Sequence, residues 1–142
     1  MRILLTGSTG YIGKRLLPTL IEAGHHVICC VRDTKRFNPP KSLRDNISVI
    51  KLDLLDQSSL EHIPKDIDGA YYLVHSMSSS GDYKSMEETS AINFRNALQR
   101  TNVKHVIYLG GIVNEVELSK HLTSRKNVEN ELSRGDYNFT AL

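Results

Sequence analysis

The chain has 142 residues, of which 39% are hydrophobic and 24% charged, with nine glycines, four prolines and no tryptophan. Such a chain can bury a core without metal ions or disulfides, and its composition excludes a disordered chain, a collagen-like repeat and a disulfide scaffold. Its formal net charge is only +2 and is spread along the chain, which argues against nucleic acid and a membrane surface as partners.

Six short apolar runs predict strands that are buried on both faces of a parallel sheet. Each run is rich in Val, Ile, Leu or Tyr, as expected for the inner strands of an α/β protein. The runs cover residues 2–6, 26–32, 47–53, 70–75, 105–110 and 138–142.

Segments with helical periodicity separate most of these runs, so the chain alternates strand and helix as an α/β fold does. We expect helices over residues 11–23, 56–62, 83–101 and 117–133. Gly24 should end the first helix, and Pro18 should bend it because proline removes one backbone hydrogen bond. Residues 33–46 and 76–82 are expected to be irregular loops after strand ends, at the edge of the sheet where ligands bind.

Cys29 and Cys30 are the only cysteines of the chain. They are neighbours within a predicted strand, so their side chains should point to opposite faces of the sheet. We expect both thiols to be reduced and buried, as in a cytoplasmic protein. The apolar start of the chain is too short for a secretory signal, and no apolar run approaches the length of a membrane span.

The most specific motif is a set of three glycines, Gly7, Gly10 and Gly13, between the first predicted strand and the first predicted helix. The first glycine permits a tight turn, the second leaves room for a pyrophosphate, and the third lets the helix pack closely on the strand. Backbone N–H groups at the start of the helix can then bind phosphate oxygens. This arrangement predicts a dinucleotide site.

A nucleoside-triphosphate loop is the alternative for this segment, because Gly13-Lys14 matches the end of that motif. However, five residues separate Gly7 from Gly13, whereas the motif requires four. In addition, Arg15 stands where a Ser or Thr must hold magnesium. The segment therefore does not fit a triphosphate loop.

The spacing of the three glycines, preceded by Thr6, resembles that of the short-chain dehydrogenase/reductase superfamily. Tyr11-Ile12-Gly13 is similar to the extended and atypical branches, which include epimerase/dehydratase-like enzymes and NmrA-like NAD(P)-binding proteins. The resemblance covers residues 1–142 and implies one Rossmann-type domain, a doubly wound parallel sheet of about six strands in the order 3-2-1-4-5-6. It implies a cofactor site formed by Gly7, Thr9, Gly10, Tyr11, Ile12, Arg32, Asp53, Leu54, Leu73, Val74 and His75.

The resemblance also implies which part of the cofactor these residues bind. Asp53 and Leu54, at the end of the third predicted strand, correspond to the residues that hold the adenine ring. Leu73, Val74 and His75 correspond to the strand end under the nicotinamide ribose, where the family has small residues, so His75 departs from the pattern. The histidines have no neighbours at the spacing of zinc ligands, and we expect no metal site.

The end of the second predicted strand bears on the choice between NADP and NAD. Relatives that prefer NAD have an acidic residue there for the ribose 2′-hydroxyl, whereas this chain has Val31 followed by Arg32. A guanidinium can bind a 2′-phosphate through two hydrogen bonds, so NADP is the expected cofactor. Asp33 is one position further on, and a shift of one residue would restore an NAD-type acid, so NAD stays possible.

The chain lacks the family's catalytic residues at the positions where the resemblance places them. Gly110 stands in place of the serine after the fifth predicted strand, and His121 and Arg125 stand in place of the tyrosine and lysine on the next helix. An imidazole can transfer protons near neutral pH, whereas an arginine can only bind a ribose hydroxyl or a phosphate. His121 and Arg125 are therefore the catalytic candidates, and the alternative is a solvent-exposed basic helix face.

Two classes of function stay open. The first is an oxidoreductase or an epimerase-like enzyme that acts on an unknown small-molecule substrate. The second is a non-catalytic NAD(P) sensor that regulates or scaffolds a partner, as NmrA-like relatives do, and the changed catalytic positions favour it. The chain stops at Leu142 within an apolar run, and extended relatives are longer, so we expect a fragment that lacks the substrate-binding part.

Overall fold

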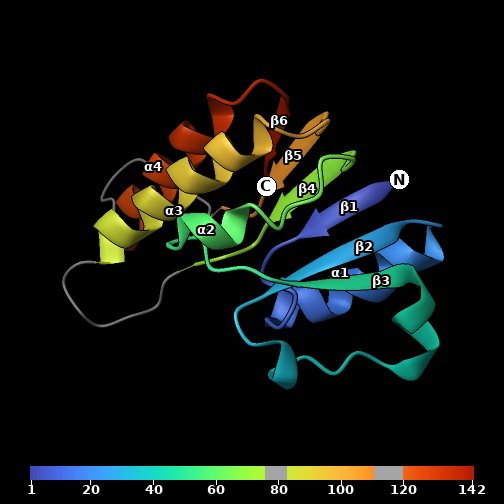
Figure 1. The fold of residues 1–142 in the computed structure, drawn as a ribbon. Helices are drawn as coiled ribbons and strands as arrows, with labels where there is room; N and C mark the ends of the chain where they lie inside the picture. The colour runs from blue at the N-terminus through green and yellow to red at the C-terminus, as the bar shows by residue number, and fades with distance from the viewer. Residues whose placement is uncertain (76–82, 111–119) are drawn as a thin grey trace.

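The computed structural model describes residues 1–75, 83–110 and 120–142, without the side chains of residues 83 and 120–122. Six parallel strands form one sheet in the order β3-β2-β1-β4-β5-β6 (Figure 1), which confirms the predicted Rossmann-type arrangement. The strands are β1 (Arg2–Leu5), β2 (His26–Val31), β3 (Ile47–Lys51), β4 (Gly69–Tyr72), β5 (His105–Tyr108) and β6 (Asn138–Ala141).

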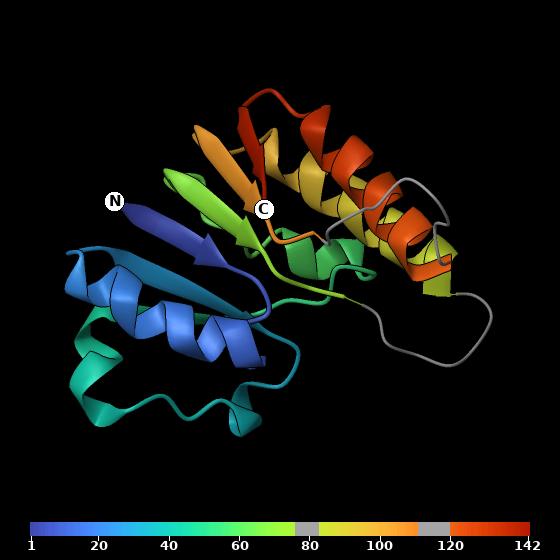
Figure 2. The same ribbon diagram turned by 180° about the vertical axis from the view of Figure 1, so that it is seen from behind.

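Helices cover both faces of the sheet. α1 lies against one face, in front of β1 and β2 in Figure 2, and α2, α3 and α4 lie against the other face in Figure 1. In the described part of the chain the helices are α1 (Tyr11–Glu22), α2 (Gln57–Leu60), α3 (Tyr83–Leu98) and α4 (Lys120–Ser133), with the short 3-10 helices η1 (Thr34–Arg36) and η2 (Lys41–Asn46).

The buried side chains form two clusters, one on each face of the sheet. Cys30 packs in the larger cluster with Phe94 of α3, and Cys29 packs in the smaller cluster with Leu17 of α1. Both cysteines are free and buried, as predicted, and burial raises the pKa of the Cys29 thiol to about 12. Neighbouring side chains of β2 therefore pack on opposite faces of the sheet, as expected for a strand that is buried on both faces.

Several strands end earlier than the sequence predicts, because their carboxyl ends turn into the loops at the edge of the sheet. β2 ends at Val31 rather than Arg32, and β4 ends at Tyr72 rather than His75. After β4 the Leu73 N–H donates to the Thr6 hydroxyl (3.1 Å) instead of a strand carbonyl. A side-chain hydroxyl here takes the place of a backbone hydrogen bond between strands. The pattern of hydrophobic residues does not reveal this replacement, so it does not predict where the strand ends.

The prediction that residues 33–46 form an irregular loop is wrong in part, because this segment contains η1 and η2. The Asp33 carboxylate begins η1 by accepting a hydrogen bond from the Lys35 N–H (3.0 Å). A 3-10 helix of one or two turns has no apolar periodicity that could identify it in a sequence. The prediction of a loop over 76–82, and of a helix start at 117, lies outside the described residues.

The first helix continues through Pro18 and ends at Glu22, close to the predicted boundary. Gly24 follows with a φ of +80°, a left-handed conformation that favours glycine after a helix. α1 therefore runs from the glycine turn to the far end of the sheet, with its N-terminus at the carboxyl ends of the strands (Figure 2). This placement orients the free N–H groups of its first turn toward the ligand-binding edge.

Candidate functional site

A cavity of about 490 Å³ opens at the carboxyl ends of β1, β2, β3 and β4. This is the edge at which the order of the strands reverses about β1, the usual ligand-binding position in an open α/β sheet. The lining residues are Thr6, Gly7, Thr9, Gly10, Cys30, Val31, Arg32, Leu52, Asp53, Leu54, Leu55, Leu73, Val74, His75, Met86 and Ser90.

The cavity brings together most of the residues that the sequence predicts for a cofactor site. Tyr11 and Ile12 do not line it, since they lie in the first turn of α1 with exposed fractions of 69% and 45%. The Tyr11 ring instead stacks on the Arg15 guanidinium, 3.7 Å from its centroid. The predicted residues in the lining are Gly7, Thr9, Gly10, Arg32, Asp53, Leu54, Leu73, Val74 and His75.

The glycine turn is compact because two of its glycines make contacts that a side chain would prevent. Gly7 has a φ of +69°, and a Cβ there would lie 2.9 Å from the Leu73 carbonyl oxygen. A Cβ on Gly13 would collide with the Gly7 carbonyl, so the third glycine lets α1 begin directly against the turn. Gly10 closes the turn by donating its N–H to the Gly7 carbonyl oxygen (2.9 Å).

Two buried hydroxyls, which sequence reasoning missed, fix this turn to the neighbouring strands. Thr6 Oγ1 donates to the Tyr71 carbonyl oxygen (3.0 Å), toward β4. Ser8 Oγ donates to the Cys30 carbonyl oxygen (3.1 Å) of β2. Small hydroxyl residues beside a turn glycine are a known sign of such side-chain to backbone bonds, so the signal was present in the sequence.

The start of α1 can bind an anion. Gly10 is the N-cap and no side chain caps the helix, so the N–H groups of its first turn have no carbonyl partner within the helix. A Cβ on Gly10 would meet only the Gly7 carbonyl oxygen, at 3.2 Å, and would otherwise occupy the space above the turn. The arrangement suits a phosphate oxygen, which the positive end of the helix dipole also favours.

The loop after β3 is held rigidly at the other side of the cavity. The Asp53 carboxylate accepts the Leu55 N–H (3.0 Å), and Ser59 Oγ donates to the Asp53 carbonyl oxygen (2.8 Å). Asn93 of α3 donates its amide to the Leu54 carbonyl oxygen (2.8 Å) in a buried contact. Ser59 and Asn93 were not expected as site residues, because each acts through the backbone of a residue that lines the cavity.

Arg32 and Asp33 differ in their surroundings. Arg32 is exposed and lines the cavity. Asp33 is outside the lining, and its carboxylate is occupied by the Lys35 N–H (3.0 Å) and by Arg36, whose Nε lies 3.5 Å away. A cation therefore faces the cavity at the end of β2, and the nearby acid is already paired.

His75 lies on the β4 side of the cavity, close to residues of β5, α3 and α4. Its ring meets the Tyr108 ring with 6.1 Å between centroids. The pKa of His75 is lowered by burial and then by the positive charge of Arg125, while Glu87 and a backbone hydrogen bond with Leu109 act in the opposite direction. The imidazole is therefore neutral at neutral pH.

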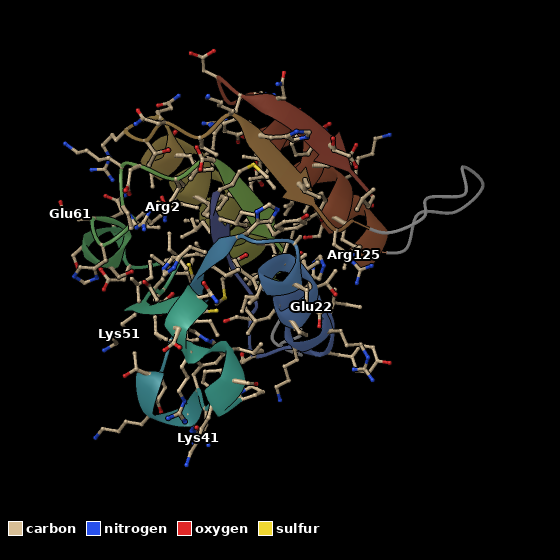
Figure 3. All side chains as sticks on the ribbon, turned by 90° about the vertical axis from the view of Figure 1, so that its right-hand side faces the viewer. Arg2, Glu22, Lys41, Lys51, Glu61 and Arg125 are labelled. Atoms are coloured by element: carbon tan, nitrogen blue, oxygen red, sulfur yellow. The ribbon has the colours of Figure 1, made fainter. Side chains whose placement is uncertain are left out.

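The two catalytic candidates are on α4. The side chain of His121 lies outside the described residues. Arg125 is half-buried and does not line the cavity, although its charge reaches His75. In Figure 3 it comes from α4, well apart from Lys41 of η2 and Lys51 of β3.

Within residues 1–75, 83–110 and 120–142, no group of three or more His, Cys, Asp and Glu side chains is arranged to hold a metal ion. Over the same ranges, every helix is too short or too polar to cross a membrane.

A family model described as NAD(P)H-binding matches residues 7–140. The chain is 34% identical over 82 residues to an isoflavone reductase homolog of Zea mays, a match that covers 54% of this chain and 26% of the maize protein. The family match and the strand order agree with the resemblance to the short-chain dehydrogenase/reductase superfamily.

Solved structures share the fold at low sequence identity. A nucleoside-diphosphate-sugar epimerase of Staphylococcus aureus superposes with a TM-score of 0.81 and 23% identity, over 99% of this chain and 49% of the epimerase. A triphenylmethane reductase of Citrobacter sp. also gives 0.81, with 18% identity, over 99% of this chain and 48% of the reductase. The chain thus spans about half the length of each structure, and at these identities the likeness shows the fold alone.

Proposed function

The chain belongs to the NAD(P)H-binding family, and on that premise we propose that residues 1–142 form the NADP-binding domain of an oxidoreductase or an epimerase-like enzyme. The observation that carries the proposal is the cavity itself, which both the glycine turn and Arg32 line. The name of the maize relative favours a reductase. A nicotinamide dinucleotide would supply hydride transfer, which protein side chains cannot provide.

The residues of the cavity fit such a cofactor. Gly10 leaves the space above the turn free of side chain, and the first turn of α1 has no side-chain cap, so a diphosphate would find free N–H donors there. The two nucleosides would extend to either side of β1. One would lie toward Arg32 and Asp53, and the other toward His75, which lie on opposite sides of β1 and line the same cavity.

The surroundings of Arg32 support NADP over NAD. Its guanidinium is exposed at the cavity, where it can bind a ribose 2′-phosphate. NAD sites commonly have a carboxylate at this strand end for the ribose hydroxyls. Asp33, the acid that follows Arg32, lies outside the cavity lining and contacts Arg36 and the backbone of η1.

Titration of the chain with NADPH, NADH and 2′,5′-ADP tests the proposal directly. We expect NADPH to bind at least tenfold more tightly than NADH, since one charge-assisted contact contributes about 1.5–3 kcal/mol and 1.4 kcal/mol is a factor of ten. Equal affinities would refute the NADP assignment. Absence of binding for every ligand would refute the dinucleotide site.

The variant Gly10→Ala distinguishes an effect on NADPH affinity from an effect on the stability of the fold. The added methyl group should weaken NADPH binding at least tenfold by occupying the diphosphate position, and the only neighbour it meets is the Gly7 carbonyl at 3.2 Å. The free energy of unfolding in urea should fall by only about 1 kcal/mol, because the φ of −78° is open to alanine but the N-cap position favours glycine. Gly69→Ala, within β4, is the matched control and should leave the affinity for NADPH unchanged. Unchanged NADPH binding by Gly10→Ala would contradict the assignment.

A non-catalytic NADP sensor is the second candidate function. It is favoured by Gly110, His121 and Arg125, which stand in place of the family's serine, tyrosine and lysine. Hydride exchange with a panel of carbonyl and alcohol compounds, measured in the protein that contains this chain, separates the two. Turnover that falls in His121→Ala supports the enzyme, and tight NADPH binding without turnover supports the sensor.

A further inference from the structure

His75 lies on the opposite side of the glycine turn from Arg32 and Asp53. β2 and β3 are on one side of β1 and β4 is on the other, and all three residues line the same cavity. If the diphosphate binds at the turn, as the proposed function requires, the adenosine end lies toward Arg32 and Asp53. The nicotinamide end then lies toward His75.

The imidazole of His75 has charged or titratable neighbours on three elements. In the described part of the chain these are Tyr108 of β5, with its ring centroid 6.1 Å away, Glu87 of α3 and Arg125 of α4. The Tyr108 hydroxyl donates to the Arg125 carbonyl oxygen (3.3 Å), and Ser124 Oγ donates to the buried Glu87 carboxylate. These bonds hold α4 in place, so the positive charge of Arg125 stays close to the ring.

We propose that His75 meets the nicotinamide end of the bound dinucleotide and, by gaining a proton in acid, makes the chain discriminate between the oxidised and the reduced forms. Oxidised nicotinamide carries a positive charge, whereas reduced nicotinamide is neutral. A protonated His75 therefore repels the oxidised form and leaves the reduced form unaffected. The positive charge of Arg125 also disfavours the oxidised form, and this effect does not change with pH because a guanidinium stays charged.

The sign of the pH dependence follows from the surroundings of the ring. Burial and Arg125 lower the pKa of His75 below the usual value of 6.5, so the ring is neutral at neutral pH and gains its proton only in acid. The ratio of the dissociation constants for NADP⁺ and NADPH should therefore be constant near neutrality and rise on acidification. Protonation of the 2′-phosphate affects both forms alike and cancels in this ratio.

The test is to titrate the chain with NADP⁺ and with NADPH, by calorimetry, at a series of pH values from about 7.5 down to about 5. We expect the ratio to rise as the pH falls, by up to roughly tenfold once the ring is fully protonated, as two positive charges ~6–8 Å apart in a partly hydrated site would produce. In His75→Asn, which has no titrating ring, the ratio should not change with pH. A constant ratio in the wild-type chain, or an equal rise in His75→Asn, would overturn the proposal.

Arg125→Gln provides a second and independent readout. It should lower the ratio near neutral pH, where His75 is uncharged, because it removes a permanent positive charge that reaches the His75 ring. Lys126→Gln is the matched control, since Lys126 is the next residue of α4 and is exposed, and it should behave as the wild type. An unchanged ratio in Arg125→Gln would count against the proposal. Failure of this inference differs from failure of the proposed function, since in the first case all dinucleotides still bind and in the second none does.

Discussion

Arg32 and Asp33 are neighbours in the sequence, yet only Arg32 lines the cavity. The Asp33 carboxylate accepts a hydrogen bond from the Lys35 N–H and pairs with the Arg36 guanidinium in η1. The Arg32 side chain, in contrast, lines the cavity. The sequence leaves the choice between the two open, because a shift of register by one residue exchanges them. The place of Arg32 in the cavity lining is the observation that supports our proposal of NADP.

Arg32→Ala should therefore abolish the preference for NADPH over NADH. Loss of a charge-assisted contact to the 2′-phosphate weakens NADPH binding by about 1.5–3 kcal/mol, roughly tenfold to a hundredfold, and leaves NADH binding nearly unchanged. Lys41→Ala removes the same charge from η2, outside the cavity lining, and should have little effect on either ligand. Equal weakening of NADPH and NADH by Arg32→Ala would show that Arg32 does not meet the 2′-phosphate.

At the scale of elements, the carboxyl edge of the sheet is built by loops that side chains of distant elements hold in place. Asn93 illustrates this, because it projects from α3 to the backbone of Leu54, 39 residues earlier in the chain. Thr6 and Ser8 connect the glycine turn to β4 and β2 in the same way. These bonds fix the backbone of the glycine turn and of the loop after β3 relative to the sheet.

Asn93→Ala should loosen the loop after β3 and so weaken binding of adenosine. The variant leaves the buried Leu54 carbonyl without its donor, which costs about 1–3 kcal/mol of unfolding free energy. We expect urea unfolding to register this loss, and NADPH and 2′,5′-ADP to weaken by a similar factor, because both contain adenosine. Asn96→Ala changes an exposed asparagine of the same helix and serves as the control. Full retention of both affinities would show that the loop does not depend on Asn93.

The sequence predicts the strands, their order and the glycine turn well, because each depends on local pattern or on a motif with fixed spacing. It fails where tertiary contacts decide the outcome. The boundary of β4 depends on the Thr6 hydroxyl, η1 depends on a single carboxylate, and the role of Asn93 depends on a contact between α3 and the loop after β3. None of these bonds leaves a periodic signal in the sequence.

At the scale of the whole molecule, the cavity joins the two layers of the fold. Leu73 packs with the cluster under α1, while Leu52 and Leu54 belong to the cluster under α3, and all three line the cavity. A ligand bound there contacts both clusters at once. Binding should therefore stabilise the two layers together rather than one of them.

We expect the chain to unfold in one transition whose midpoint rises with NADPH. At a free ligand concentration of about 100 times Kd, linkage adds about 2.7 kcal/mol to the free energy of unfolding. For a chain of this size that corresponds to roughly 10 °C in Tm, which calorimetry or circular dichroism at two wavelengths can measure. Gly10→Ala should unfold near the wild-type temperature without ligand and lose most of the shift with it. Two separate transitions, of which NADPH moves only one, would show that the two layers respond independently and that the cavity does not couple them.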